Sequence, residues 1–330
     1  MASTPASTAT PITVNRTIAG YLERLQALQL PNGSWPYRKM DAVGFTEATS
    51  YALLAYRAAG KAAPHADACF HWLLTLRRKS GGYAAQEAVQ FSNWTTSLVV
   101  LAQLHHGRQQ DAQSGIDWLL GTVGIEGEPL TRALRNVFGK ETPYPQNHQG
   151  WPWTRGAVSW IMPTVLGTEA LRKANQLHPS SDRQKRVREG EGAVLERRCS
   201  DGGWNHGASS ALGVDHHSYP ETTGMALLCL RHLEASRIAG ADEFALSYLK
   251  KRHSAVTTSW LQLGLVSRGK SVPPLPIEDA TTAAGNTTTK APEITESHGE
   301  ETAIQCRTTV DLALRVIALS AIQGNNIFNV

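Results

Sequence analysis

A repeated turn and helix constrain this chain more than any other feature of its sequence. A turn with glycine followed by an aromatic residue recurs roughly every 50 to 70 positions, a spacing that accommodates two helices and their connections. A short polar stretch and an apolar segment follow each turn. The turn aromatics are Trp35, Tyr83, Trp151 and Trp204, and the following segments align on Thr49, Thr96, Thr164 and Thr223.

The apolar segments differ from the helical segments that precede the turns. The segments that begin at the aligned threonines are apolar nearly all round, which predicts helices shielded on every side. By contrast, residues 68–76, 114–120 and 244–249 show the one-sided 3.6-residue pattern of surface helices. The sequence therefore predicts an all-α fold, an α/α toroid in which outer helices surround inner ones. Residues 257–263 resemble a fifth, degenerate copy.

The pattern predicts one toroid domain over residues 18–330, preceded by a flexible arm at 1–17 that is rich in Ser, Thr, Ala and Pro. Residues 267–301 are rich in Thr, Pro, Gly and Glu, so we expect a mobile loop there. The helical pattern returns at 304–322, where it could close the ring. The insertion at 121–149 is irregular and could cover one end.

Composition excludes several classes of protein. No apolar run reaches the 18 or more residues of a membrane-spanning helix. The formal charge is +4 and the main basic stretch, 183–188, has no interleaved aromatics, so we expect no nucleic acid partner. The start lacks the basic and apolar regions of a secretion signal, which favours a cytoplasmic location. The four cysteines occur singly, which argues against a disulfide framework or a thiolate metal cluster.

Over residues 20–265 the turns and Thr-headed helices resemble the prenyltransferase and squalene oxidase repeat family, which includes squalene-hopene cyclases and class II diterpene cyclase domains. The resemblance implies a barrel of concentric helices that binds an apolar substrate centrally. Aligning Thr49 or Thr223 with the Thr of the acidic motif of family cyclases puts Glu47 or Glu221 at the proton-donating position, but the full motif is absent. The zinc-binding set of the protein prenyltransferases is also absent, so we expect no metal and no cofactor.

Glu47 and Glu221 fall in the first turn of expected helices. One interpretation is that they cap those helices, because a carboxylate there gains from free backbone N–H groups and the helix dipole. The other is that burial raises the pKa of one carboxyl, which then serves as a general acid. Asp215 and His217 precede the fourth inner helix and could relay protons or bind a metal. Adjacent residues rarely point at one ion, however, so we expect no metal there.

Aromatic residues form two groups. Those near the starts of inner helices could line a cavity and present their π faces to an isoprenoid or a carbocation, or they could simply pack in the core. The turn aromatics are expected to pack between neighbouring helix pairs. The candidate cavity-lining residues are Trp94, Trp153, Trp160, Tyr219 and Trp260, with His217 on the same rim.

Three functions are compatible with these features. The leading hypothesis is a terpene-cyclase-like protein that binds an isoprenoid or another apolar molecule, as an acid-catalysed cyclase or isomerase that uses Glu221, Glu47 or Asp215. The second is a non-catalytic scaffold with an unknown protein partner, which the missing motifs favour. The third is a carbohydrate-active enzyme on an α/α barrel, which requires two carboxylates in the cavity.

Overall fold

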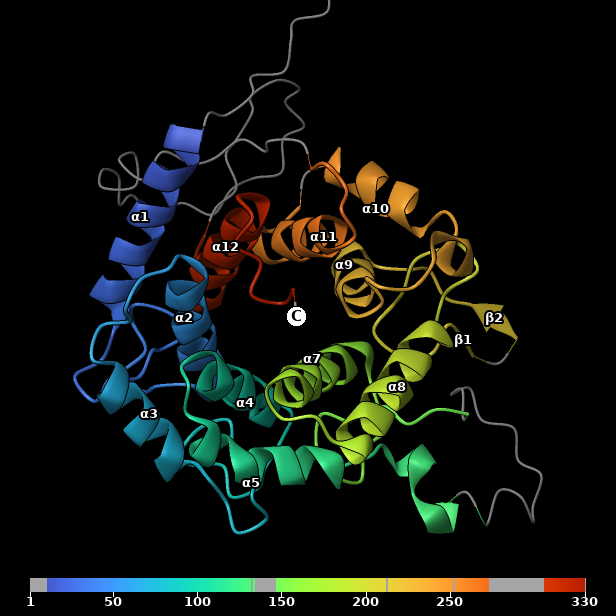
Figure 1. The fold of residues 1–330 in the computed structure, drawn as a ribbon, viewed down its shortest axis with the longest axis horizontal. Coiled ribbons are helices and arrows are strands. Elements are labelled where there is room, and N and C mark those ends of the chain that lie inside the picture. The colour runs from blue at the N-terminus through green and yellow to red at the C-terminus, as the bar shows by residue number, and fades with distance from the viewer. Residues whose placement is uncertain are drawn as a thin grey trace, which may run out of the picture.

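The fold consists of two concentric layers of helices (Figure 1). The computed structural model describes residues 11–131, 133, 147–211, 213–251, 253–272 and 306–329. Apart from one short hairpin, β1 (Ser210–Ala211) and β2 (Val214–Asp215), the regular structure in this part of the chain is helical. The predicted all-α toroid is therefore confirmed.

Six helices form a closed inner ring. Contacts run from α2 to α4, α7, α9, α11 and α12 in turn, and α12 then contacts α2. These helices are buried on nearly all sides over most of their length, as the all-round apolar pattern predicts. The inner helices are α2 (Thr46–Ala58), α4 (Thr95–His105), α7 (Ile161–Leu177), α9 (Pro220–Cys229), α11 (Ala255–Ser267) and α12 (Thr309–Ile322).

The outer helices bury only one face against this ring (Figure 1). They lie over the seams between inner helices; α5, for example, contacts both α4 and α7. Two short 3-10 helices, η1 (Ile125–Gly127) and η2 (Ala235–Ile238), lie in the connections. The outer helices are α1 (Pro11–Leu28), α3 (Ala66–Thr75), α5 (Gln109–Leu120), α8 (Ser181–Leu195) and α10 (Ala241–Leu249).

The repeated threonine and aromatic residue hold each turn to its inner helix. In every copy the threonine hydroxyl accepts the backbone N–H of the turn aromatic, whose side chain is buried. Each tryptophan of the turns also donates its indole N–H to the end of the preceding outer helix, at Leu25, Leu119 or Val194. The aromatics therefore pin helix pairs together. The pairs are Trp35–Thr49 at 2.9 Å, Tyr83–Thr96 at 2.8 Å, Trp151–Thr164 at 3.0 Å and Trp204–Thr223 at 3.0 Å.

All inner helices run in the same direction because each begins against the turn of the next copy. The free N–H groups at four of these helix starts donate to carbonyls of the following turn, which satisfies donors that would otherwise lack a partner. The inner helices therefore start together at one end of the ring. The contacts are Thr309 to Tyr37, Thr46 to Ala85, Trp94 to Trp153 and Ile161 to His206.

The last two inner helices close the ring as the sequence predicts. Helix α11 carries the degenerate fifth copy, and α12 begins with a capping box in which Thr308 and Asp311 bind each other's backbone N–H. Helices α9 and α11 cross closely at Gly224, where an added Cβ would lie 2.4 Å from the Trp260 carbonyl. Only glycine fits at this crossing.

Several expectations about the segments fall partly outside the described residues. Residues 11–17 of the expected arm belong to α1, whereas 1–10 lie outside the described part. Of the expected loop at 267–301, Ser267 ends α11 and residues 273–301 are not described. The four cysteines are free and buried. Within the described ranges, no helix is both long and apolar enough to cross a bilayer.

Candidate active site

Two glutamates lie at the end of the ring where the inner helices begin. Glu47 lies in the first turn of α2 and Glu221 in the first turn of α9. Helices α2 and α9 stand on opposite sides of the inner ring (Figure 1). The charge of Glu221 nevertheless raises the pKa of Glu47, so the two carboxyl groups interact electrostatically.

Glu47 is held in an environment that favours its neutral form. Burial, followed by the negative charge of Glu221, raises its pKa to about 7. A helix N-terminus favours the ionised carboxylate, so burial here outweighs the helix dipole. The hydroxyl of Tyr37, in the first repeat turn, donates a hydrogen bond to Oε2 of Glu47. Near neutral pH this carboxyl is therefore poised between its acid and base forms.

Glu221 receives more support for its ionised form. Burial raises its pKa, but a hydrogen bond with the side chain of Thr257 opposes that effect. The hydroxyl of Ser254, the N-cap of α11, donates to Oγ1 of Thr257 at 3.0 Å. The Thr257 hydroxyl is thus oriented to donate to the Glu221 carboxylate. Such a pair of unlike environments is how one site separates an acid from a base.

Tyr51 lies one helical turn after Glu47 and interacts electrostatically with both carboxyl groups. Its side chain is fully buried, and within the described part of the chain its hydroxyl has no hydrogen-bond partner. Burial, and then the charges of Glu47 and Glu221, raise its pKa well above the ordinary value. The phenol therefore stays protonated and supplies a donor at the base of the site.

Most of the expected aromatic residues surround the same end of the ring. The rings of Trp94 and Trp153 meet edge to face with centroids 5.1 Å apart, and both side chains are half-buried. Trp160 is also half-buried, and Tyr219 is exposed and lies 4.9 Å from the His206 ring. These rings offer partly exposed apolar faces near the two glutamates.

Trp260 does not belong to this group. It is fully buried in α11, where its ring contacts those of Tyr51 and Phe328. The core-packing alternative holds for this residue. Its position five residues into the helix, rather than at the helix start, is the sequence signal that separates it from the others.

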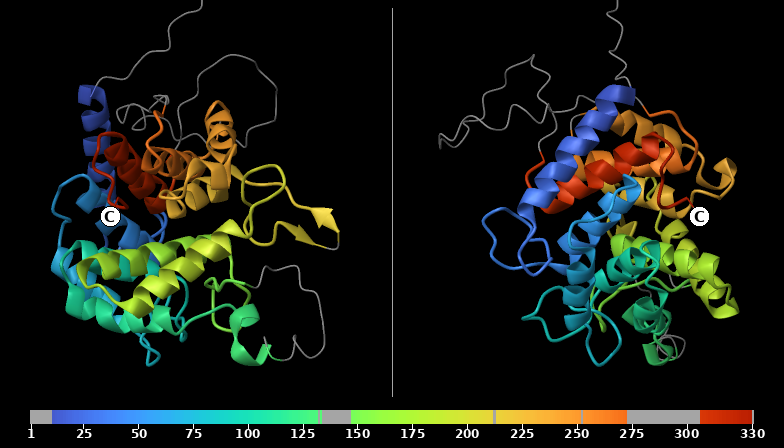
Figure 2. Two further views of the ribbon diagram at one scale, coloured as in Figure 1. Left: turned by 45° about the vertical axis from the view of Figure 1, so that its right-hand side comes forward. Right: turned by 60° about the vertical axis from the view of Figure 1, so that its left-hand side comes forward.

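Asp215 and His217 lie apart from the glutamate pair. Asp215 belongs to β2 of the hairpin, which projects from the ring (Figure 2), and its side chain is exposed. His217 is exposed too, with Nδ1 4.0 Å from a carboxylate oxygen of Asp201. Among the described residues, no three His, Cys, Asp or Glu side chains converge as metal ligands.

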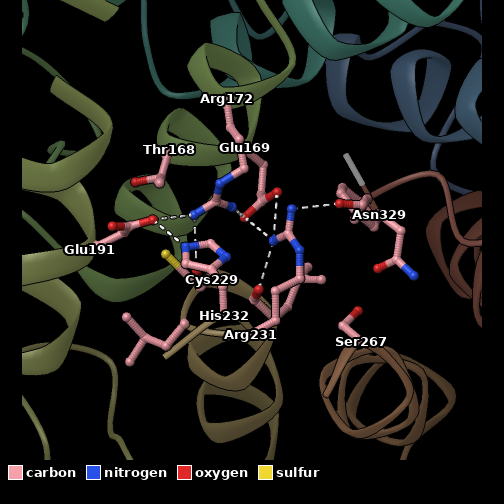
Figure 3. Close-up of polar contacts among 12 residues, drawn as sticks. Thr168, Glu169, Arg172, Glu191, Cys229, Arg231, His232, Ser267 and Asn329 are labelled. Atoms are coloured by element: carbon pink, nitrogen blue, oxygen red, sulfur yellow. Dashed lines mark hydrogen bonds and ion pairs between the residues drawn. The ribbon is translucent and has the colours of Figure 1, made fainter. Parts of the chain in front are cut away.

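The opposite end of the ring carries a buried ion network (Figure 3). Glu169 of α7 is only 1% exposed and binds two guanidinium groups, those of Arg172 and Arg231. Arg172 also binds Glu191 at 2.7 Å, and Arg231 donates to the Phe328 carbonyl at 2.6 Å. Every charge in the network has a partner, which is the condition for burying it.

The C-terminal segment after α12 crosses this same end (Figure 1). Asn326 donates to the Ser267 hydroxyl at 2.8 Å, and the Phe328 side chain is 2% exposed. These contacts stabilise this end of the ring, and a pocket of about 310 Å³ remains open beside them. The glutamates at the other end form the candidate site.

Sequence reasoning missed three residues of this site: Tyr37, Tyr51 and Thr257. Tyr51 could have been found, because it follows Glu47 by four positions and so shares its helix face. Tyr37 and Thr257 reach the glutamates from a turn and from a different helix. Tyr37 lies only 10 positions before Glu47, in the turn that precedes α2, whereas the proximity of Thr257 to Glu221 depends on the packing of α11 against α9.

No protein-family model matches the sequence, and no curated protein matches it either. Solved structures do match. An α-1,6-mannanase from Salegentibacter sp. HEL1_6, solved with α-1,6-mannotriose, has a TM-score of 0.60 at 8% identity over 95% of this chain and 100% of that one. A family 8 endoglucanase from Klebsiella pneumoniae has a TM-score of 0.55 at 12% identity over 92% and 98% of the two chains.

A further match, an α-amylase from Clostridium perfringens, has a TM-score of 0.58 at 10% identity over 96% of this chain and 99% of that one. The identities are low enough that these likenesses establish the fold alone. They show an α/α toroid, a fold that this chain shares with these glycoside hydrolases.

The expected terpene cyclase resemblance is therefore wrong, and so are the cyclase, isomerase and isoprenoid-binding functions drawn from it. The similar structures are glycoside hydrolases. The physical reason lies in the repeat itself. Its threonine and aromatic residue bind each other to fasten a turn to a helix, so they report how helix pairs are joined and carry no information on what the ring binds.

Proposed function

We propose that the protein is a carbohydrate-active enzyme that hydrolyses a glycosidic bond, with Glu47 and Glu221 as its two carboxyl groups. The observation that carries this proposal is the electrostatic contact between the two groups across the ring, in environments that treat them differently. Glycoside hydrolysis requires two carboxyl groups on either side of the scissile bond, one protonated and one ionised.

Glu47 is the general acid in this mechanism. Its raised pKa keeps a proton available near neutrality, and that proton passes to the glycosidic oxygen as the bond from the anomeric carbon to this oxygen breaks. Glu221, supported by Thr257, is the ionised partner. It either removes a proton from the attacking water or attacks the anomeric carbon itself, and the hydroxyl of Tyr51 offers a donor below the reacting groups.

The partly exposed rings at the site support a sugar ligand. Aromatic side chains combine a flat apolar face with little conformational freedom, so they suit the apolar faces of sugar rings. Trp94, Trp153 and Trp160 provide such faces beside the carboxyl pair. The mannanase of the same fold was solved with an α-1,6-linked trisaccharide, which agrees with a saccharide as the ligand of this fold.

The test is release of reducing sugar from a panel of α-1,6-mannan, β-1,4-glucan, mixed-linkage β-glucan and starch. We expect turnover of at least one polymer. The rate should fall as the pH rises past about 7, because Glu47 then loses its proton. Glu47→Gln and Glu221→Gln should each lower kcat by about 100-fold or more. The exposed Glu243 provides a matched control, since Glu243→Gln should retain full activity.

Absence of turnover on every polymer would refute the proposal. So would turnover that survives both substitutions, because the carboxyl pair would then have no part in the reaction. Nuclear magnetic resonance of the first anomer released shows whether Glu221 acts as base or nucleophile.

A further inference from the structure

A pocket lies in the turns at the start of the second and third inner helices, on the outer side of the ring. It encloses about 730 Å³. Four cationic side chains line it, and none of the described residues that line it is a carboxylate. The cations are Arg77, Arg78, Lys79 and Arg155, and the aromatic lining residues are Phe91 and Trp118.

This pocket shares its wall with the candidate active site. Asn93 and Thr154 form an isolated β-bridge, and the backbone of Trp94 donates to the carbonyl of Trp153. The indole rings of Trp94 and Trp153 belong to the candidate site, whereas Ser92 and Thr154 line the pocket. One pair of bridged segments therefore serves both spaces.

Comparison of two repeats explains why this pocket is cationic. In the first, the indole N–H of Trp72 on α3 donates to Oε1 of Glu87 at 3.1 Å. In the next repeat, Trp118 on α5 takes the place of Trp72. Glu87 lies four residues after the turn aromatic Tyr83, and the residue four positions after the next turn aromatic, Trp151, is Arg155. The buried Trp118 indole N–H consequently has no acceptor within the described part of the chain. The exchange replaces a carboxylate with a guanidinium.

Among the described residues, no carboxylate forms an ion pair with the cations of this pocket. Arg77, Lys79 and Arg155 are exposed, and the Arg78 guanidinium is bound to loop carbonyls, including that of Val89 at 2.6 Å. Phe91 is 57% exposed beside them. Guanidinium groups beside an exposed aromatic ring are suited to a sugar that carries an acidic group, because the ring contacts the sugar face while arginine binds the oxyanion.

From these contacts we infer that the pocket binds the carboxylate of an acidic sugar, such as a uronic acid residue, in a polysaccharide that continues past Trp94 and Trp153 into the active site. The carbohydrate part of this inference rests on the proposed function. The anion site depends only on the cationic pocket.

The experiment is calorimetric titration of the full chain with a tetragalacturonate, with the methyl ester of the same oligosaccharide and with inorganic phosphate. We expect the acid to bind at least tenfold more tightly than its neutral ester and more tightly than phosphate. Arg155→Glu, which restores the sign of charge found in the preceding repeat, should abolish this preference, as should Lys79→Glu. Lys250→Glu, the same charge reversal at an exposed site on the far end of α10, should leave it intact.

Equal affinity for acid and ester, or equal losses in Arg155→Glu and Lys250→Glu, would overturn the inference. Phosphate that binds as tightly as the acid and displaces it would show a simple ion site and overturn the carbohydrate part. The binding preference needs no turnover, so it can survive failure of the proposed hydrolysis. Conversely, hydrolysis of neutral polymers without the preference would refute only this inference.

Discussion

Replacing Glu47 with glutamine should make the protein more stable at alkaline pH. The carboxyl pKa is about 7 in the folded chain against an ordinary value of 4.5. A carboxyl group whose pKa is raised by folding stabilises the fold fully below its unfolded value, and this contribution is lost as the pH rises from 4.5 to about 7. At 1.36 kcal/mol per pH unit the loss approaches about 3 kcal/mol, and partial access to solvent reduces it to about 2 kcal/mol.

The glutamine of Glu47→Gln cannot ionise and so avoids this loss. We expect the variant to gain about 2 kcal/mol over the wild type at pH 8, or about 3 °C in Tm for a chain of this length, and almost nothing at pH 4. Thermal and urea unfolding at both pH values measure the gain, and Glu243→Gln serves as the exposed control. A gain that is the same at pH 4 and pH 8 would refute the raised pKa, and with it the role of Glu47 as the acid.

Three further substitutions test the framework by urea unfolding. Glu169→Gln should cost about 3–5 kcal/mol, because it leaves two buried guanidinium groups without their counter-charge; a loss below 1 kcal/mol would contradict the network's structural role. Thr164→Val removes the acceptor of the Trp151 N–H and should cost about 1–3 kcal/mol. Gly224→Ala should cost at least about 1–3 kcal/mol through overpacking, whereas Gly121→Ala, where an added Cβ lies 3.6 Å from its nearest neighbour, should be nearly neutral.

Much of the fold was predictable because its signals are local. The hydroxyl of Thr49 binds the N–H of Trp35 only 14 positions away, and the same pairing recurs in three later copies. A contact between residues this close in the chain produces a motif that can be recognised in the sequence. The all-round apolar helices likewise predicted an inner layer, because burial on every side leaves no polar face.

The candidate site was only half predictable. Glu47 and Glu221 stood out because each begins an inner helix, but the sequence favoured capping over acid chemistry. Whether Glu47 caps its helix or acts as an acid depends on the pKa of its carboxyl group. That pKa depends in turn on the charge of Glu221 and on burial by the assembled ring. The family resemblance was wrong for a related reason. The repeat encodes how helix pairs are fastened together in a toroid, and it carries no information on what the ring binds.

The helices, their two layers and the turns that join them could be read from the sequence, because apolar periodicity and the Thr–aromatic bond act between near neighbours. Which residues meet across the ring followed only from the assembled fold. That fold brings Glu47 under the electrostatic influence of Glu221, buries Trp260, places Asp215 on a hairpin and assembles Glu169 and its arginines at the opposite end. Those contacts join residues far apart in the chain, and electrostatic interactions between them exist only after the ring closes.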